Sequence, residues 1–260
     1  MKPHAIIDAL HRPVVLPRPP RRVVSLVPSQ TELLADLGLD AEVVGVTKFC
    51  VHPAHWRQEK AVVGGTKTVD CEAISALKPD LVLVNKEENT RETVEALAAV
   101  APVYVTDVHD LPGALAMIDA VGQLVDRVAQ AAALVDEIEA AFAALPRFAP
   151  VRAAYLIWRG PYMAAGGGTF IDDMLARGGF SNALGATPRY PEVTVETLRA
   201  AGLDRLLLSS EPFPFGAQHV EALSQALPGV RVELVDGELF SWFGSRIRAT
   251  PAYLRRLRGA

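Results

Sequence analysis

The chain has 260 residues, of which half are hydrophobic and 22 % are charged, which is typical of folded proteins and excludes disordered, collagen-like and coiled-coil chains. At about 150 residues per domain, this length fits one large domain or two smaller lobes. The 26 basic and 30 acidic residues give a net charge of −4, and they form no long basic run. We therefore expect no nucleic acid as a partner.

Cysteine content and hydropathy say little about where the protein works. Cys50 and Cys71 are too few for a disulfide framework. No apolar stretch reaches the ~18 residues of a membrane span, and residues 1–10 lack the apolar segment of a signal peptide. As written, the sequence predicts a cytoplasmic protein, and an upstream start would instead predict the periplasm or cell envelope.

The first part of the chain alternates short apolar runs with helical patterns. Short apolar pieces alternate with Pro13, Pro17, Pro19 and Pro20 in residues 1–20, which predicts an extended arm or hairpin. Strands are predicted at 23–27, 42–47, 61–65, 80–85 and 102–106, and helices at 31–38, 71–77 and 91–100. The first helix would have Ser29 or Thr31 near its N-cap. Such alternation favours a parallel sheet covered by helices, in an N-terminal lobe at 21–110.

Residues 111–145 show only helical periodicity. Asp126 as an N-cap predicts a helix from Arg127 to Leu145, about 28 Å long at 1.5 Å per residue, which is enough to bridge two lobes. Strands are then predicted at 153–158, 204–209 and 230–235, and helices at 169–179, 193–202, 219–227 and from 250 onward. The expected fold class is α/β, with two Rossmann-like lobes joined by a long helix and the second lobe at 146–260.

An internal repeat supports two related lobes. Residues 70–84 align without a gap onto 194–208 at an offset of 124, which brings Asp70 onto Thr194 as N-caps and one apolar strand onto the other. Chance similarity between two amphipathic units is the alternative, since any strand–helix unit needs a cap and apolar spacing.

Aromatic and polar residues gather where the predicted strands end, which is where open parallel sheets bind ligands. Large flat rings suit a bulky, partly apolar ligand held between the lobes, although each ring could instead pack its own loop. The predicted ligand-binding residues are Ser29, Gln30, Phe49, His52, Trp56, Lys86, Glu87, Trp158, Arg159, Tyr162, Phe213, Phe215, Trp242 and Phe243. For Glu87 a solvated charged turn is the favoured alternative.

Two further patterns have competing interpretations. Cys50, His52 and His55 lie within six residues and could supply soft metal ligands, or could simply pack the loop. The glycines at 166–168 could bind an anion ahead of a helix, but Ile171 breaks the dinucleotide fingerprint and a turn explains the run. Neither a nucleophile elbow nor a catalytic set emerges, so we expect no enzyme and no catalytic cofactor.

Glu72 and Glu196 occupy equivalent positions near the start of the repeated helices. Their interaction with the helix dipole would explain both carboxylates. Their equivalence also permits two acidic contacts, one from each lobe, for basic residues of a partner.

These stretches together resemble the substrate-binding proteins of ABC importers for cobalamin, ferric siderophores and haem, in particular the cobalamin-binding members. The resemblance covers residues 21–258 and rests on SLVPSQTELLADLG, LKPDLVLV, the bridging helix and SWFGSRI. It implies two α/β lobes joined by a rigid helix. It also implies docking of Glu72 and Glu196 onto arginines of a permease, and a cleft aromatic at Trp242 followed by Phe243.

The sequence thus predicts a monomer that binds a metal chelate, with cobalamin or another corrinoid favoured over a ferric siderophore, and that presents it to an ABC permease. The loop FCVHPAHW, with its Cys and His residues, departs from the cobalamin-binding pattern. It leaves open a cytosolic protein of the same fold that binds or senses a corrinoid, haem or a metal ion through Cys50, His52 and His55.

Overall fold

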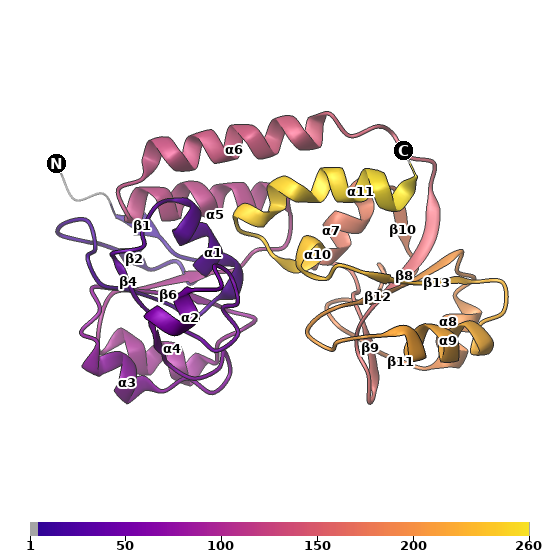
Figure 1. Cartoon of the computed structure of the whole chain (residues 1–260), viewed down its shortest axis with the longest axis horizontal. Coiled ribbons are helices and arrows are strands. Elements are labelled where there is room, and N and C mark those ends of the chain that lie inside the picture. Colours follow the sequence, from indigo (N-terminus) through magenta and orange to yellow (C-terminus); the bar gives the residue numbers. More distant parts are fainter. Residues whose placement is uncertain (1–4, 260) are drawn as a thin grey trace. The chain divides into compact units, whose positions relative to one another are not determined.

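The computed structural model describes residues 5–259, which divide into two compact units (Figure 1). Unit 1 contains the described residues up to Val108, together with Gly113–Glu139 and Phe243–Arg246. Unit 2 contains His109–Pro112, Ala140–Trp242 and the described residues from Ile247. The predicted boundaries at residues 110 and 145 stay predictions, and the first four residues of the predicted arm lie outside the described part.

Unit 1 has a parallel five-stranded sheet whose order is β5-β4-β3-β6-β7. The strands are β3 (Val23–Ser25), β4 (Val43–Val46), β5 (Ala61–Val62), β6 (Leu81–Asn85) and β7 (Val103–Thr106). The helices of its α/β layers are α1 (Pro28–Asp36), α2 (Trp56–Glu59), α3 (Cys71–Ala76) and α4 (Arg91–Ala98). β3 and β6 are buried along their whole length, as expected for central parallel strands. Ile74, Val94 and Leu97 of α3 and α4 pack onto this sheet.

The described part of the predicted arm is a hairpin, as the prolines suggested. β1 (Ile6–Ile7) pairs antiparallel with β2 (Pro13–Val14). Asp8 closes the turn, because its carboxylate accepts the backbone N–H groups of Leu10 and Arg12 and the Arg12 guanidinium. The backbone N–H of Ala9 donates to the carbonyl of Val105 at 2.9 Å. This bond attaches the arm to the β7 edge of the sheet.

Helix α1 begins three residues earlier than predicted. Its N-cap is Val27 and its first residue is Pro28, so neither Ser29 nor Thr31 caps it. Proline is well suited to this place because its missing N–H has no partner in the first turn and its fixed φ is helical. Gly38 follows the C-cap Leu37 and, with φ of +75°, takes the left-handed conformation common after a helix.

Residues 111–145 form two helices, α5 (Leu111–Leu124) and α6 (Val128–Ala143). Asp126 does not cap α6, because it takes a left-handed φ of +57° in the turn between them. The division between the units falls inside α6, after Glu139. No described helix combines the length and apolar character that crossing a membrane requires.

Unit 2 has a mixed sheet ordered β11-β9-β8-β12-β13, with β10 also paired to β8. The strands are β8 (Val151–Trp158), β9 (Tyr162–Ala164), β10 (Phe180–Asn182), β11 (Glu192–Val193), β12 (Arg205–Ser209) and β13 (Arg231–Val235). Its helices are α7 (Phe170–Arg177), α8 (Val195–Ala200), α9 (Ala217–Ala226), α10 (Glu238–Ser241) and α11 (Thr250–Arg258), the last preceded by a 3-10 turn at Ser245–Ala249. The antiparallel strands β9 and β11 were not expected from the sequence.

The repeat predicted at an offset of 124 is present in the structure. α3 and β6 in unit 1 and α8 and β12 in unit 2 have boundaries that differ by 124 at every end. Asp70 accepts from the N–H of Ala73 at 2.9 Å, and Thr194 accepts from that of Thr197 at 3.2 Å, so both predicted N-caps are confirmed.

A second equivalent pair of residues, Asp80 and Asp204, holds the neighbouring strand in each unit, β3 in unit 1 and β8 in unit 2. Asp80 accepts the N–H of Arg22, and Asp204 accepts that of Arg152, at 2.9 and 2.8 Å. The guanidinium of each arginine then donates to the last turn of the repeated helix, at the carbonyl of Leu77 or of Ala201, with 2.7 Å in both cases. The same local chemistry therefore joins strand, helix and strand twice in one chain.

Candidate functional site

The strands of unit 1 end in a layer of small, buried polar side chains. Gln30 Nε2 donates to Thr106 Oγ1 at 2.5 Å, and Asn85 Nδ2 donates to the same oxygen at 3.2 Å. Thr106 in turn donates to the carbonyl of Val84. Ser29 and Gln30, both predicted to bind ligand, thus lie in the interior of unit 1. Their Oγ and Oε1 atoms have no hydrogen-bond partner among the described residues.

Cys50 belongs to this buried layer and does not form a metal site with the two histidines. Its Sγ lies 3.1 Å from Thr31 Oγ1 and 3.2 Å from Thr47 Oγ1. Burial raises the pKa of the Cys50 thiol and so disfavours the thiolate that binds metals. Among residues 5–259, no three His, Cys, Asp or Glu side chains come together in a way that could hold a metal ion.

The rest of the FCVHPAHW loop contributes one core residue and two outer histidines. Trp56 is 0 % exposed, and its indole N–H donates to Asp40 Oδ1 at 2.8 Å, so it packs the loop rather than offering a ring to a ligand. His52 precedes a cis proline and is half-buried. His55 is exposed and lies 3.7 Å from Asp40 and 4.0 Å from Glu59.

Phe49 is the predicted ligand-binding aromatic that unit 1 leaves accessible. Its side chain follows β4 and is 51 % exposed, with Lys48 Nζ 5.1 Å from the ring centroid. Lys86, which follows β6, forms an ion pair with Asp107 at 2.6 Å. The carbonyl of Glu87 accepts from Lys67 Nζ. The loops around Phe49 therefore combine one flat ring with charged groups.

In unit 2 the strand ends hold a cluster of aromatic rings. Trp158, at the end of β8, is 40 % exposed and meets Phe213 edge-on at a centroid distance of 5.8 Å. Phe213 contacts the buried Phe215 at 4.8 Å, and both rings contact His219 at 5.4 Å. Arg159 is exposed beside Trp158, and Tyr162 packs against the core of unit 2. Trp158 is thus an accessible ring that contacts a half-buried ring, Phe213, behind which Phe215 is buried.

Trp242 and Phe243, the two residues predicted as cleft aromatics, both have buried side chains. Glu211 explains the placement of Trp242, since its Oε1 accepts the indole N–H at 2.9 Å and the Ser241 hydroxyl at 2.5 Å. Burial raises the pKa of this carboxyl, an effect that the two donors oppose.

The segment Phe243–Arg246 belongs to unit 1, although it follows Trp242 directly. Arg246 makes two hydrogen bonds of 2.6 and 2.8 Å with the carboxylate of Glu32. Gly244 packs so closely on α1 that a Cβ there would lie 2.1 Å from the Ser29 carbonyl oxygen.

The glycine run at 166–168 allows close backbone contact and does not form an anion site. A Cβ on Gly166 would lie 2.1 Å from the carbonyl oxygen of Thr187, and one on Gly167 would lie 2.2 Å from that of Gly185. Thr169 already caps the helix that follows, α7, by accepting the N–H of Asp172.

Glu72 and Glu196 are exposed at the second position of α3 and of α8. Hydrogen bonds from its own backbone N–H and from Thr194 lower the pKa of Glu196. Dipole stabilisation and a surface role are compatible here, because a carboxylate at a helix N-terminus stays ionised and accessible.

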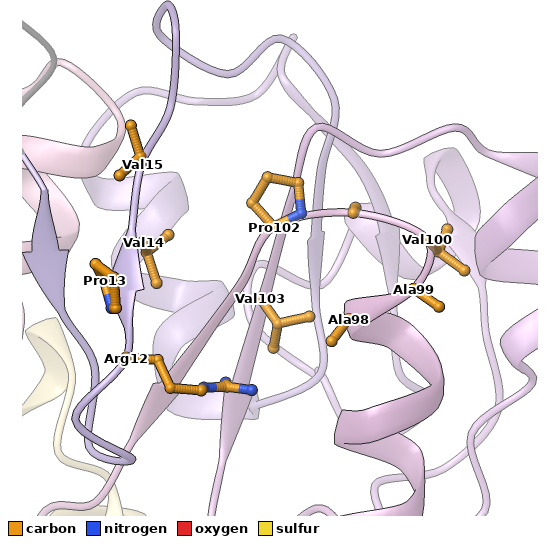
Figure 2. Close-up of a pocket in the computed structure, with 10 residues that line it drawn as sticks. Arg12, Pro13, Val14, Val15, Ala98, Ala99, Val100, Pro102 and Val103 are labelled. Carbon is orange, nitrogen blue, oxygen red and sulfur yellow. The ribbon is translucent and has the colours of Figure 1, made fainter.

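An open pocket of about 530 Å³ in unit 1 lies away from these loops (Figure 2). It is lined by Arg12, Pro13, Val14 and Val15 of the arm and by Ala98, Ala99, Val100, Ala101, Pro102 and Val103. Val103 is the first residue of β7, so the pocket is at the opposite end of that strand from Thr106. No predicted site residue lines it.

Two residues that support the aromatic rings, Glu211 and His219, were not predicted. Glu211 lies in the loop that follows β12, where only the aromatic residues Phe213 and Phe215 were predicted to bind ligand. His219 stands three positions after Gly216, which is the spacing of a reciprocal helix cap, and this spacing could have indicated its role.

The sequence was compared with family models and with known proteins, and both comparisons found matches. A family model described as periplasmic binding protein matches residues 23–222. The cobalamin-binding protein of Halobacterium salinarum strain R1 is 30 % identical over 200 residues, which cover 74 % of this chain and 54 % of that protein. An ABC transporter substrate-binding lipoprotein of Bacillus subtilis strain 168 is 32 % identical over 126 residues, or 46 % of this chain and 39 % of that protein. The chain thus matches about half or less of the length of these curated relatives.

Among solved structures, the periplasmic haem-binding protein of Roseiflexus sp. RS-1 in its apo form aligns with a TM-score of 0.76 at 25 % identity. The alignment covers 92 % of this chain and 96 % of that one. The Halobacterium salinarum and Roseiflexus proteins are thus named for two different ligands, cobalamin and haem.

Proposed function

Since the chain belongs to the periplasmic binding protein family, we propose that it binds a metal chelate, with a corrinoid as the favoured ligand, and presents it to an ABC permease. The observation that carries the ligand class is the exposed Trp158 on its support of Phe213 and Phe215. An exposed indole that packs on the half-buried Phe213, itself supported by the buried Phe215, offers a rigid flat surface, which favours stacking on a macrocycle at little entropic cost.

The loops of unit 1 offer a second candidate surface for such a ligand. Phe49 is accessible there, and Lys67 and Lys86 lie on neighbouring loops that follow the strands. A ligand with a flat apolar face and a polar rim fits such a combination, since the face can stack and the rim can accept hydrogen bonds. The cobalamin-binding relative in Halobacterium salinarum favours a corrinoid over other chelates of this shape.

Calorimetric titration tests the ligand class with cyanocobalamin, haem and a ferric hydroxamate siderophore in parallel. We expect saturable binding of cyanocobalamin, weakened at least about tenfold in Trp158→Ala, because aromatic anchors of this kind contribute roughly 2 kcal/mol or more. Trp56→Phe is the matched control and should keep the affinity, since Trp56 is buried. Saturable binding of haem alone would replace the corrinoid by haem, and no binding of any of the three would refute the chelate-binding function.

The proposed permease contacts are Glu72 and Glu196, at equivalent positions of the repeat. We expect Glu72→Lys with Glu196→Lys to abolish corrinoid uptake by cells that depend on this protein, while affinity stays unchanged. Glu92→Lys is the matched control, because Glu92 is also an exposed carboxylate in the first turn of a capped helix, α4. Equal loss of uptake in the control, or loss of affinity in the double variant, would contradict docking through these two carboxylates.

A further inference from the structure

Ser210 and Glu211 make their own hydrogen bonds at the start of the loop at residues 210–216. Three further hydrogen bonds attach the part that carries Phe213 and Phe215, at residues 213–216. The N–H of Phe213 donates to the carbonyl of Ile157, and that of Phe215 donates to the carbonyl of Ser209, both at 3.3 Å. The third contact is from a side chain, since the N–H of Gly216 donates to His219 Nδ1 at 2.9 Å. The first two bonds are long, so the imidazole makes the shortest of these three attachments.

His219 occupies a position in α9 that usually belongs to glutamate or glutamine. Gly216 is the N-cap and has no side chain, and His219 is the third helical residue, whose side chain accepts the N-cap N–H in a capping box. Because Nδ1 accepts this bond, the neutral ring has its proton on Nε2. The side chain is 7 % exposed, so the cap is almost fully buried.

The same imidazole supports the aromatic rings. Phe213 and Phe215 meet it edge-on, with interplanar angles of 71° and 83°. Phe213 then contacts the exposed Trp158. One buried side chain therefore fixes both the backbone at the end of the loop and the rings that this loop presents.

We propose that His219 is a positioning residue of the chelate-binding surface, which it holds in its binding conformation through Gly216, Phe213 and Trp158. The proposal rests on the proposed function. His219 does not touch the ligand. Its two roles, as hydrogen-bond acceptor and as ring, predict different results for different substitutions.

Four variants separate these roles. His219→Gln keeps the acceptor and loses the ring, His219→Phe keeps a ring and loses the acceptor, and His219→Ala loses both. Leu223→Ala is the matched control for general destabilisation, because Leu223 is buried one turn further along the same helix and belongs to the same core. Protein labelled with 5-fluorotryptophan adds a readout that needs no ligand, with the Trp158 resonance assigned from Trp158→Ala.

We expect His219→Ala to shift or broaden the Trp158 resonance and to weaken cyanocobalamin binding about tenfold, with partial recovery in His219→Gln and in His219→Phe. In a Trp158→Ala background, His219→Ala should weaken binding no further, since the positioned ring is already absent. Leu223→Ala should lower the melting temperature and leave both the resonance and the affinity unchanged.

The outcomes distinguish this proposal from the proposed function. If the wild type binds cyanocobalamin and His219→Ala changes neither the Trp158 resonance nor the affinity, the positioning role is refuted. An equally large loss of affinity in the Trp158→Ala background would also refute it, because the effect would then not pass through Trp158. If His219→Ala moves the resonance but no chelate binds the wild type, His219 positions Trp158 and the proposed function fails.

Discussion

Units 1 and 2 share the same strand–helix–strand repeat, but the side chains at the ends of their strands differ in chemical type. In unit 1 the strand ends carry small buried polar groups such as Gln30, Asn85 and Thr106. In unit 2 they carry rings, with Trp158 accessible above Phe213. The caps and the strand-fixing carboxylates are common to both, so the repeat determines the framework while the loops determine what each unit can bind.

The largest expected effect on stability comes from core substitutions, which test whether the two copies of the repeat contribute equally to the free energy of unfolding. Ile74 and Leu198 occupy the same repeat position and are both fully buried. Replacing either by alanine should lower the free energy of unfolding by about 2–5 kcal/mol through lost burial and a cavity. Native-state hydrogen exchange should localise each loss to the unit that carries the substitution. A cost below about 1 kcal/mol at one position only would show that the two cores are packed differently.

A smaller difference is expected at the carboxylates that fix the neighbouring strands. Asp80 accepts the N–H groups of both Arg21 and Arg22, whereas Asp204 accepts that of Arg152. Asp80→Ala should therefore cost about 1–2 kcal/mol in urea denaturation, and Asp204→Ala about half as much. The reverse order would mean that the equivalence of these bonds does not extend to their energetics.

The next effect is smaller and depends on pH. Because burial raises the pKa of Glu211, its ionised form is disfavoured in the folded state, and the stability linked to this group falls as the pH rises from its unfolded pKa through its raised folded pKa. Glu211→Gln, which keeps an acceptor for Ser241 and Trp242, should melt above the wild type at pH 8 and approach it near pH 4.

Glu196→Gln serves as the comparison, because the pKa of Glu196 is lowered whereas that of Glu211 is raised. The lowered pKa of Glu196 means that its contribution is present at neutral pH and is lost as the pH falls. Its melting-temperature difference from the wild type should therefore be negative at pH 7 and shrink towards pH 3. The same sign in both variants would contradict the assignment of burial as the main cause at Glu211.

The smallest effect is chemical rather than energetic. Cys50 is buried in the polar layer with a raised thiol pKa, whereas Cys71 is partly accessible at the start of α3. A thiol-specific reagent should modify Cys71 within minutes and Cys50 only after unfolding, since the thiolate is the reacting species. Mass mapping of the modified peptides measures the order, and early labelling of Cys50 would show that its layer opens readily.

The framework was predictable because local chemistry encodes it. Asp70 and Thr194 cap their helices through bonds within three residues, and the apolar strand pattern follows them directly, so the repeat was visible before the fold. The strands β9 and β11 were missed because they are only three and two residues long and depend on pairing with one another. The start of α1 was misplaced because Pro28 looks like a turn residue and is also a favourable first helical residue.

The candidate site was only partly predictable, because exposure depends on distant partners. Trp56 is held inside by Asp40, and Trp242 by Glu211, which is 31 residues away in the sequence. Nothing near Trp158 in the sequence distinguishes it from these two. An aromatic residue on a loop thus identifies a candidate, and only the hydrogen bond of its polar atom decides whether it packs the loop or meets a ligand.

The contact between Arg246 and Glu32 has a consequence for how the chain folds during its synthesis. Unit 1 includes a segment that the ribosome adds only after most of unit 2 has been made. The sheet of the first unit can form early, but the guanidinium that pairs with Glu32 and the glycine that fits against Ser29 arrive late. A nascent chain released before residue 243 would contain every described strand of both units but would lack the contacts of Gly244 and Arg246 with α1. Premature termination should therefore yield a protein in which α1 of unit 1 frays.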